Sequence, residues 1–112
     1  MTDSSPDIDA ELARVMLESS PNGVMVTDSS GNVRVINRAL GDMLPLVPNS
    51  IGRPPIEAVP NQELADAMKT ERSDEVEFTL SSGNRDLYIR VVPLEPAGGR
   101  LALVQDVTSL RR

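Results

Sequence analysis

The stretch of sequence that decides the fold is LALVQDVTSLRR, residues 101–112. Its first four residues are apolar on both faces that a strand would present, and a strand covered on both faces is normally central in its sheet. Asp106 and Thr108 follow, and both residue types cap helices well; helix formers come next. The stretch therefore predicts a central strand over residues 101–105 that leads directly into a helix.

Two further strands precede this one. Residues 75–81 and residues 87–91 each alternate apolar with polar side chains, which is the period of two of a strand with one face in water. Turn-forming residues separate these strands, at 82–84 between the two and at 95–99 before the last strand. The C-terminal third is thus predicted to form three strands joined by turns.

The N-terminal segment predicts one amphipathic helix. Ser5 can cap it and Pro6 suits its first turn, because the N–H that proline lacks has no helical partner there. A run of breakers at 19–23 ends it. The apolar stripe on one face of this helix, spaced i, i+4, i+7 and i+8, consists of Ile8, Leu12, Val15 and Met16. The stripe is predicted either to cover the sheet of its own chain or to contact a second copy.

The middle of the chain combines a hairpin with short helices. Residues 23–28 and 33–36 are rich in β-formers and flank a turn, which predicts a hairpin. Asn37 then opens a short helix, five prolines within 45–60 leave room for one helical turn, and a second helix is predicted over 61–72. The order of elements predicts an α+β fold, a five-stranded antiparallel sheet with short helices on one face. The N-terminal helix is one candidate to cover the other face.

The residue types that this 112-residue chain lacks exclude several kinds of chemistry. Without Cys there is no thiolate nucleophile or thiolate metal site, and without His the commonest general base, metal ligand and haem ligand are missing. A formal charge of −6, with a single Phe and a single Tyr, argues against nucleic acid as a partner. We therefore expect no enzyme activity, although catalysis by carboxylates alone stays open.

Neither membrane insertion nor a metal site is expected. No apolar run approaches the ~18 residues of a membrane span, and the acidic N-terminus is unlike a signal peptide, so a cytoplasmic location is predicted. The acidic residues that lie close together in the sequence are Glu71, Asp74, Glu75 and Glu77. An exposed strand face explains them better than a divalent cation, since such a cation needs oxygens that converge from a defined loop.

Six short motifs follow one another between residues 17 and 112. They are LESSPNGV (17–24), DSSGNV (28–33), VINRA (35–39), IGRP (51–54), GGRL (98–101) and DVTSLRR (106–112). In this order and spacing they resemble PAS domains, most closely the cytoplasmic PAS domains of PhoR-like sensor histidine kinases. The last motif is typical of PAS domains that continue into a dimerisation helix.

The resemblance implies a PAS fold with an N-terminal flanking helix (1–20), a PAS core (21–108) and the start of an output helix (109–112). It implies a non-catalytic sensory domain that forms a homodimer and signals to a kinase module in the same chain beyond Arg112. The other interpretation is a PAS interaction module of a transcription regulator or of a cyclic-nucleotide signalling enzyme. The missing Cys and His exclude covalent flavin photochemistry and His-ligated haem. No cofactor is expected, and a small non-covalent ligand stays open.

Three sets of residues are the candidate functional positions. The resemblance assigns signal relay to Asp106, Val107 and Thr108, which would couple the sheet to the output helix. It assigns dimer contact to the apolar stripe of the N-terminal helix. Asn37 is expected to act as a helix cap rather than as a ligand contact. The residues predicted to lie between helices and sheet, as core or around a small apolar ligand, are Met43, Ile56, Leu64, Met68, Ile89 and Leu103.

Overall fold

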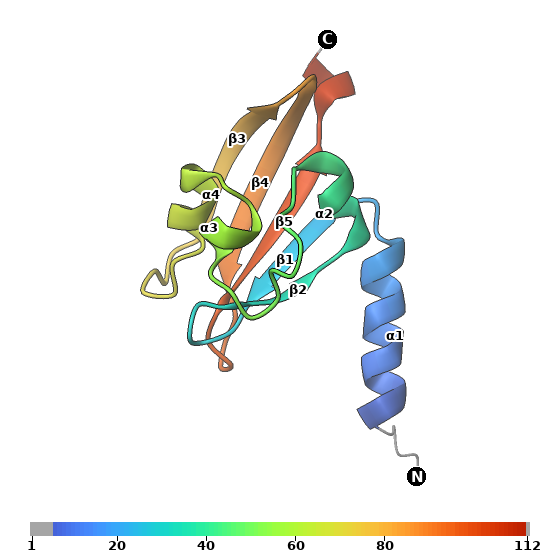
Figure 1. The fold of residues 1–112 in the computed structure, drawn as a ribbon, viewed down its shortest axis with the longest axis vertical. Helices are drawn as coiled ribbons and strands as arrows, with labels where there is room; N and C mark the ends of the chain where they lie inside the picture. The colour runs from blue at the N-terminus through green and yellow to red at the C-terminus, as the bar shows by residue number, and fades with distance from the viewer. Residues whose placement is uncertain (1–5, 112) are drawn as a thin grey trace.

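The fold is a five-stranded antiparallel sheet with short helices on one face and one longer helix beside it (Figure 1). The computed structural model describes the backbone of residues 6–111 and the side chains of residues 11–109. Its elements in chain order are α1 (Pro6–Ser19), β1 (Gly23–Thr27), β2 (Val33–Ile36), α2 (Arg38–Met43), α3 (Pro55–Ala58), α4 (Gln62–Ala67), β3 (Val76–Ser82), β4 (Arg85–Pro93), β5 (Arg100–Asp106) and the 3-10 helix η1 (Thr108–Arg111). This arrangement confirms the α+β fold that the sequence predicts.

The strand order is β2-β1-β5-β4-β3, so the last strand of the chain is the middle strand of the sheet. On one side β5 pairs with β1, where Ala102 lies opposite Met25. On the other side it pairs with β4, where Val104 lies opposite Ile89. The central position of β5 confirms the prediction made from its apolar residues on both faces.

The hydrophobic core fills the space between the sheet and helices α2, α3 and α4. One face of each strand points into it, because successive residues of a strand alternate between the two faces. The buried core residues are Met25, Val33, Leu40, Met43, Leu44, Ala58, Val59, Leu64, Ala67, Met68, Leu87, Ile89, Val91, Ala102 and Val104. Burying a large aliphatic side chain contributes roughly 1.5–3 kcal/mol, so these contacts hold the short helices against the sheet.

Helix α4 is shorter than the sequence predicts, because it ends at Ala67 and not near Arg72. The carbonyl oxygen of Ala67 accepts a hydrogen bond from Nε of Arg100 at 2.9 Å, in place of one from the next helical turn. Arg100 also donates to the carbonyl oxygens of Arg72 and Asp74. A contact with a distant strand therefore overrides the local helix propensity of this segment.

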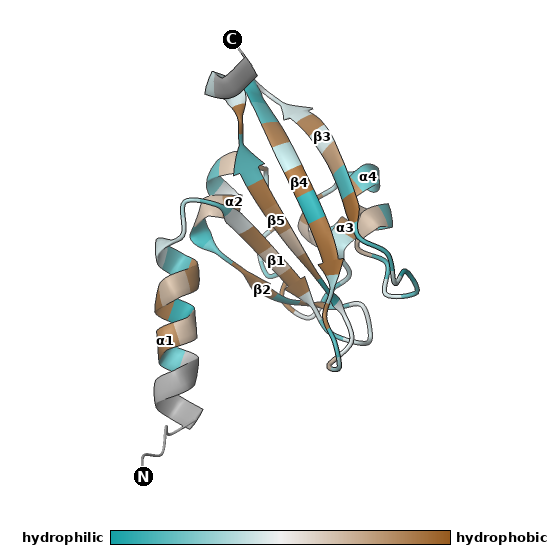
Figure 2. Ribbon diagram, turned by 180° about the vertical axis from the view of Figure 1, so that it is seen from behind, coloured by the Kyte–Doolittle hydropathy of each residue, from teal (hydrophilic) through white to brown (hydrophobic). Residues whose placement is uncertain are grey.

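No described helix covers the face of the sheet opposite the short helices, and hydrophobic residues follow one another along its strands (Figure 2). The partly exposed apolar side chains of this face are Val26, Val35, Val92, Leu101 and Leu103, and we call them the far-face strip. The prediction that Leu103 lies between helices and sheet is therefore wrong. Its neighbours Ala102 and Val104 point into the core, so strand alternation turns Leu103 to the far face.

Helix α1 does not cover the far-face strip but extends beside the β2 edge of the sheet (Figures 1 and 2). A hollow lies between the two, with Ala13 and Leu17 of α1 on one side and Val35 and Ile36 of β2 on the other. Of the two arrangements that the sequence leaves open for this helix, the described part of α1 does not adopt the one that shields the second face of its own sheet, and both α1 and that face keep apolar surface exposed.

Candidate functional site

The end of β5 is tied to the start of β4 by hydrogen bonds around Asp106. Its Oδ1 accepts hydrogen bonds from the backbone N–H of Thr108, at 3.0 Å, and from the Thr108 hydroxyl. Its Oδ2 pairs with Nη1 of Arg85 at 2.7 Å. The backbone N–H of Asp86 donates to Thr108 Oγ1 at 2.9 Å, and the N–H of Val107 donates to the Asp86 carbonyl oxygen at 2.8 Å. The three residues predicted to relay a signal are thus joined to the β3–β4 hairpin.

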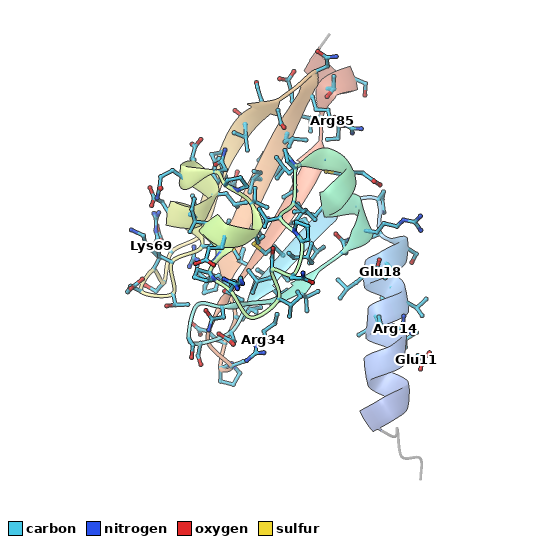
Figure 3. The ribbon with its side chains drawn as sticks, viewed as in Figure 1. Glu11, Arg14, Glu18, Arg34, Lys69 and Arg85 are labelled. Atoms are coloured by element: carbon cyan, nitrogen blue, oxygen red, sulfur yellow. The ribbon has the colours of Figure 1, made fainter. Side chains whose placement is uncertain are left out.

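The same contacts keep the Asp106 carboxylate charged. The hydroxyl and N–H of Thr108 and the guanidinium of Arg85 hold the pKa of Asp106 below its usual range, against an opposing effect of desolvation. An ionised carboxylate only accepts hydrogen bonds, so its donors are matched to that form. Arg85 lies at the exit end of the sheet, beside the start of η1 (Figure 3). We call Arg85, Asp106 and Thr108 the exit cluster.

Asn37 joins the end of α1 to the start of β1 and to α2. Its Oδ1 accepts hydrogen bonds from the backbone N–H groups of Val24, at 2.8 Å, and Leu40, at 3.2 Å. Its Nδ2 donates to the carbonyl oxygens of Leu17, at 2.8 Å, and Asn22, at 2.9 Å. The buried amide therefore uses all four of its hydrogen-bonding positions. The predicted cap of α2 is confirmed, and the other three bonds determine how α1 leaves the sheet.

The apolar stripe expected to contact a second copy is exposed along α1. The exposed fractions are 57% for Leu12, 50% for Val15 and 63% for Met16. Ile8 belongs to α1, but its side chain lies outside the described residues. Charged side chains flank the stripe, including Arg14 and Glu11, which form an ion pair at 3.2 Å (Figure 3). Large apolar side chains gathered on one exposed helix indicate an interaction surface.

The residues predicted around an inner pocket do not all converge on one site, although Ile56 and Met68 line the same pocket. Four of them are buried in the core between helices and sheet, namely Met43, Leu64, Met68 and Ile89. Leu103 lies on the far face, as described above. Ile56 is 38% exposed on α3 and lines a pocket on the outer side of the helices. The prediction that Ile56 lies between helices and sheet is therefore wrong. The short α3 helix turns Pro55 and Ala58 inward and leaves Ile56 outside.

Arg100 is a central residue that the sequence analysis does not single out. Its side chain is 0% exposed and is the largest fully buried one among the described residues. The guanidinium donates to three backbone carbonyl oxygens, of Ala67 at 2.9 Å, of Arg72 at 2.8 Å and of Asp74 at 2.7 Å. Desolvation lowers the pKa of Arg100, and the charge of Asp74 opposes this. The sequence feature that could have identified Arg100 is the alternation of side chains along β5, which turns the first residue of that strand toward the core.

Two of the four acidic residues near β3 form ion pairs with arginines. Asp74 Oδ2 lies 2.8 Å from Nη2 of Arg72, and Glu75 Oε1 lies 2.9 Å from Nη2 of Arg90. Among the residues that the structure describes, no three potential ligands gather around a possible metal position. Within the same part of the chain, every helix is too short or too polar to cross a bilayer.

Nearly the whole chain matches a known family. The family model described as PAS fold matches residues 11–107. The chain belongs to the PAS family. PAS domains are sensory modules and generally not catalytic, so the exit cluster and the exposed surfaces of this PAS domain are candidates for signalling contacts. A comparison with curated proteins found no match.

Solved structures share the fold of this PAS domain at low sequence identity. The PAS domain of a protein from Colwellia psychrerythraea has a TM-score of 0.62 and 16% identity, over 90% of this chain and 98% of that one. The sensor region of a sensor histidine kinase has a TM-score of 0.64 and 17% identity, over 100% of this chain and 56% of that one. The E. coli DhaR(N)–DhaL complex has a TM-score of 0.58 and 28% identity, over 88% of this chain and 35% of that one.

Proposed function

We propose that this PAS domain is the non-catalytic sensory and dimerisation domain of a cytoplasmic sensor histidine kinase. The exit cluster carries the proposal, because it lies where the central strand passes into η1, on the way to a kinase module beyond Arg112. The motif that forms this cluster is typical of PAS domains that continue into a dimerisation helix. A solved sensor region of a histidine kinase shares the fold, which supports this context.

The exit cluster provides a physical basis for the relay. Asp106 is the last residue of β5 and Arg85 is the first residue of β4. If the two strands twist or slide against each other, the contacts of Asp106 with Arg85 and with Thr108 change together. Hydrogen bonds to charged groups are short and directional, so such a shift reorients or releases the start of η1. The kinase module would then receive a change in the direction of the outgoing helix.

Kinase output in the full-length protein tests the relay. Asp106→Ala and Thr108→Ala should each change the rate of autophosphorylation, because each breaks the connection between β5 and η1. Gln105→Ala is the matched control, since Gln105 is an exposed neighbour in β5 outside the cluster. Circular dichroism of the isolated domain should show that all three variants fold. Wild-type autophosphorylation in both cluster variants would refute the relay.

We propose dimerisation between α1 of one chain and the far-face strip of another. The stripe of α1 is exposed, and the side chains of the far-face strip are partly exposed. Helix α1 stands beside the β2 edge and away from the far face of its own chain (Figure 2). The α1 stripe of one chain can therefore cover the far-face strip of another. A two-fold axis would use each surface in both chains, as isologous interfaces do.

Sedimentation velocity tests this interface from both sides. The double variant Leu12→Glu/Met16→Glu should be monomeric, because it places charges in the stripe. Leu103→Glu should have the same effect from the sheet. Two controls should stay dimeric, namely Glu11→Gln on the same helix and Thr79→Glu at an exposed position of the same sheet face. A dimer that persists in both sets of stripe and sheet variants contradicts the proposed interface.

The second candidate is a protein-interaction module of a transcription regulator or of a cyclic-nucleotide signalling enzyme. The similarity to a chain of the E. coli DhaR(N)–DhaL complex favours it, since that structure is a complex of two different proteins. The sequence of the parent protein beyond Arg112 distinguishes the two candidates. A helix that carries a His followed closely by Glu or Asp would support the kinase, and its absence there would favour the interaction module.

A further inference from the structure

An outer pocket of 310 Å³ lies on the helix side of the domain. Four segments form its walls: the turn after β1, the start of α3, one side of α4 and the connection from α4 to β3. None of its described lining residues belongs to a strand, and Met68 is the lining residue that also belongs to the core cluster, so the pocket lies on the outer side of the helices and borders the packed core at Met68. Its volume lies at the lower end of the ~300–1,000 Å³ range of small-molecule sites.

The outer pocket has an apolar floor and a polar rim. Its floor consists of Pro54, Pro55, Ile56, Ala65 and Met68. On the rim, the hydroxyls of Ser30 and Thr70 form no hydrogen bond with any described side chain or backbone group. Lys69, whose Nζ lies 3.6 Å from Asp66, and Glu71 bring opposite charges to the rim. Lys69 projects from the outer side of the helices, far from Arg85 at the exit end (Figure 3).

We propose that the outer pocket binds a small, net-neutral and mostly apolar molecule that carries a hydroxyl or a similar hydrogen-bonding group. The apolar floor selects for an apolar body, and the hydroxyls of Ser30 and Thr70 offer donors and acceptors to a neutral polar group. A charged ligand gains little here, because the rim carries one charge of each sign. The convergence of four segments on a small volume fits a small molecule better than a peptide or a second chain.

Arg100 connects the outer pocket to the central strand. Residues 68–71 form one wall of the pocket, and the guanidinium holds this segment at both ends, at Ala67 before it and at Arg72 and Asp74 after it. Arg100 is also the first residue of β5, of which Asp106 is the last. A ligand that moves the wall therefore moves the acceptors of Arg100. The strand that ends at the exit cluster then changes its contacts at its other end.

This inference deepens the proposed sensory role, because it names a ligand class and the first step of the relay. Binding is measured on the isolated 112-residue chain. The relay is measured separately, as the kinase output of the Asp106→Ala and Thr108→Ala variants of the full-length protein. The pocket can therefore fail while the relay stands, and the relay can fail while the pocket binds.

Nuclear magnetic resonance of the ¹⁵N-labelled domain tests the pocket with three probes of matched size. Benzyl alcohol should shift the amide signals of Gly31, Ala65 and Thr70 in a saturable way, with a Kd on the order of 1 mM for so small a molecule. Benzoate and benzylamine, which carry a charge, should bind at least several-fold more weakly. The Nε–H signal of Arg100 and the amide of Thr108 should shift with the same saturation curve.

Two variants fill the pocket from different walls, so that misfolding of one of them does not decide the test. Ala65→Phe and Thr70→Phe should each abolish the saturable shifts with benzyl alcohol. Glu63→Phe is the matched control, since Glu63 is exposed on the same helix and does not line the pocket. It should bind benzyl alcohol as the wild type does.

The outcomes separate the two parts of the inference. Saturable shifts that survive both filling variants, or no saturable shift in the wild type, overturn the site. Benzoate or benzylamine binding as tightly as benzyl alcohol overturns the ligand class. Saturation at Gly31 and Ala65 without any change at Arg100 Nε overturns the connection to β5.

Discussion

Replacing Arg100 with methionine tests whether the buried guanidinium holds the α4–β3 connection in place. Methionine is long, flexible and uncharged, so it fills much of the same space while removing three hydrogen bonds. The three acceptors are the carbonyl oxygens of Ala67, Arg72 and Asp74. Without the guanidinium, the connection after α4 loses its attachment to the central strand, and the free energy of unfolding should fall.

The expected loss is about 2–4 kcal/mol in the free energy of unfolding. Each hydrogen bond to a charged group contributes roughly 1.5–3 kcal/mol. Two effects reduce the net loss to about half of the total for three bonds. The variant no longer bears the desolvation cost of a buried cation, and the carbonyls of Arg72 and Asp74, whose bonds are only partly buried, can turn to water. For a domain of this size the melting temperature should fall by roughly 10–15 °C.

Urea unfolding followed by circular dichroism measures this loss. The matched control is Arg72→Met, because Arg72 contributes its carbonyl to the contact while its own side chain forms an exposed ion pair with Asp74, and exposed pairs contribute little. Arg100→Lys should unfold nearly as easily as Arg100→Met, since one ammonium cannot reach three diverging carbonyls. If Arg100→Met and Arg72→Met unfold at the same urea concentration, the reasoning about the guanidinium is wrong.

Three further perturbations follow from the geometry. Asn37→Asp keeps the acceptor oxygen but loses two donors and buries a charge, so the free energy of unfolding measured in urea should fall by about 2–4 kcal/mol. A variant as stable as the wild type would contradict the role given to the four hydrogen bonds of Asn37. The pKa of Asp106 is lowered by folding, so its stabilising effect is present above its unfolded pKa of about 3.9 and is lost as pH falls through the folded value. Below about pH 4 the free energy of unfolding should therefore fall more steeply for the wild type than for Asp106→Asn. If the free energies of unfolding of the two proteins fall in parallel with pH, the prediction is contradicted. In Gly99→Ala the new Cβ would lie 2.1 Å from the carbonyl oxygen of Thr27 at a φ of +89°, so the variant should fail to fold, whereas Gly83→Ala, with a φ of +60° and nothing within 4 Å, should lose only about 1 kcal/mol; equal melting temperatures would refute the clash.

Much of the fold can be predicted because its causes act between near neighbours. The alternation of residues 75–81 and 87–91 depends only on the period of two, and the structure places strands at both. Asn37 and Asn61 cap α2 and α4 through the backbone three residues later, which is a local contact. The apolar residues on both faces of β5 place it centrally, although they leave open which face Leu103 occupies.

The candidate sites are less visible in the sequence, because the contacts that build them join distant parts of the chain. The residue types at Asp106 and Thr108 indicate capping, but their connection to Arg85 depends on the pairing of β4 with β5. The outer pocket combines the turn after β1 with two helices, of which α3 lies within the proline-rich stretch and α4 follows it. Neither arrangement follows from any local pattern.

By itself the sequence determined the kinds of element, their order, the central position of β5 and the absence of Cys and His chemistry, since propensity, capping and alternation depend on adjacent residues. Only the tertiary structure decided where α4 ends, because Arg100 captures a carbonyl oxygen 33 residues earlier in the chain. The tertiary structure also decided that α1 stands beside the sheet, because Asn37 holds the end of that helix from 20 residues away. For the same reason the far-face strip stays uncovered by α1, and residues 101–111 both complete the sheet and lead the chain out of it.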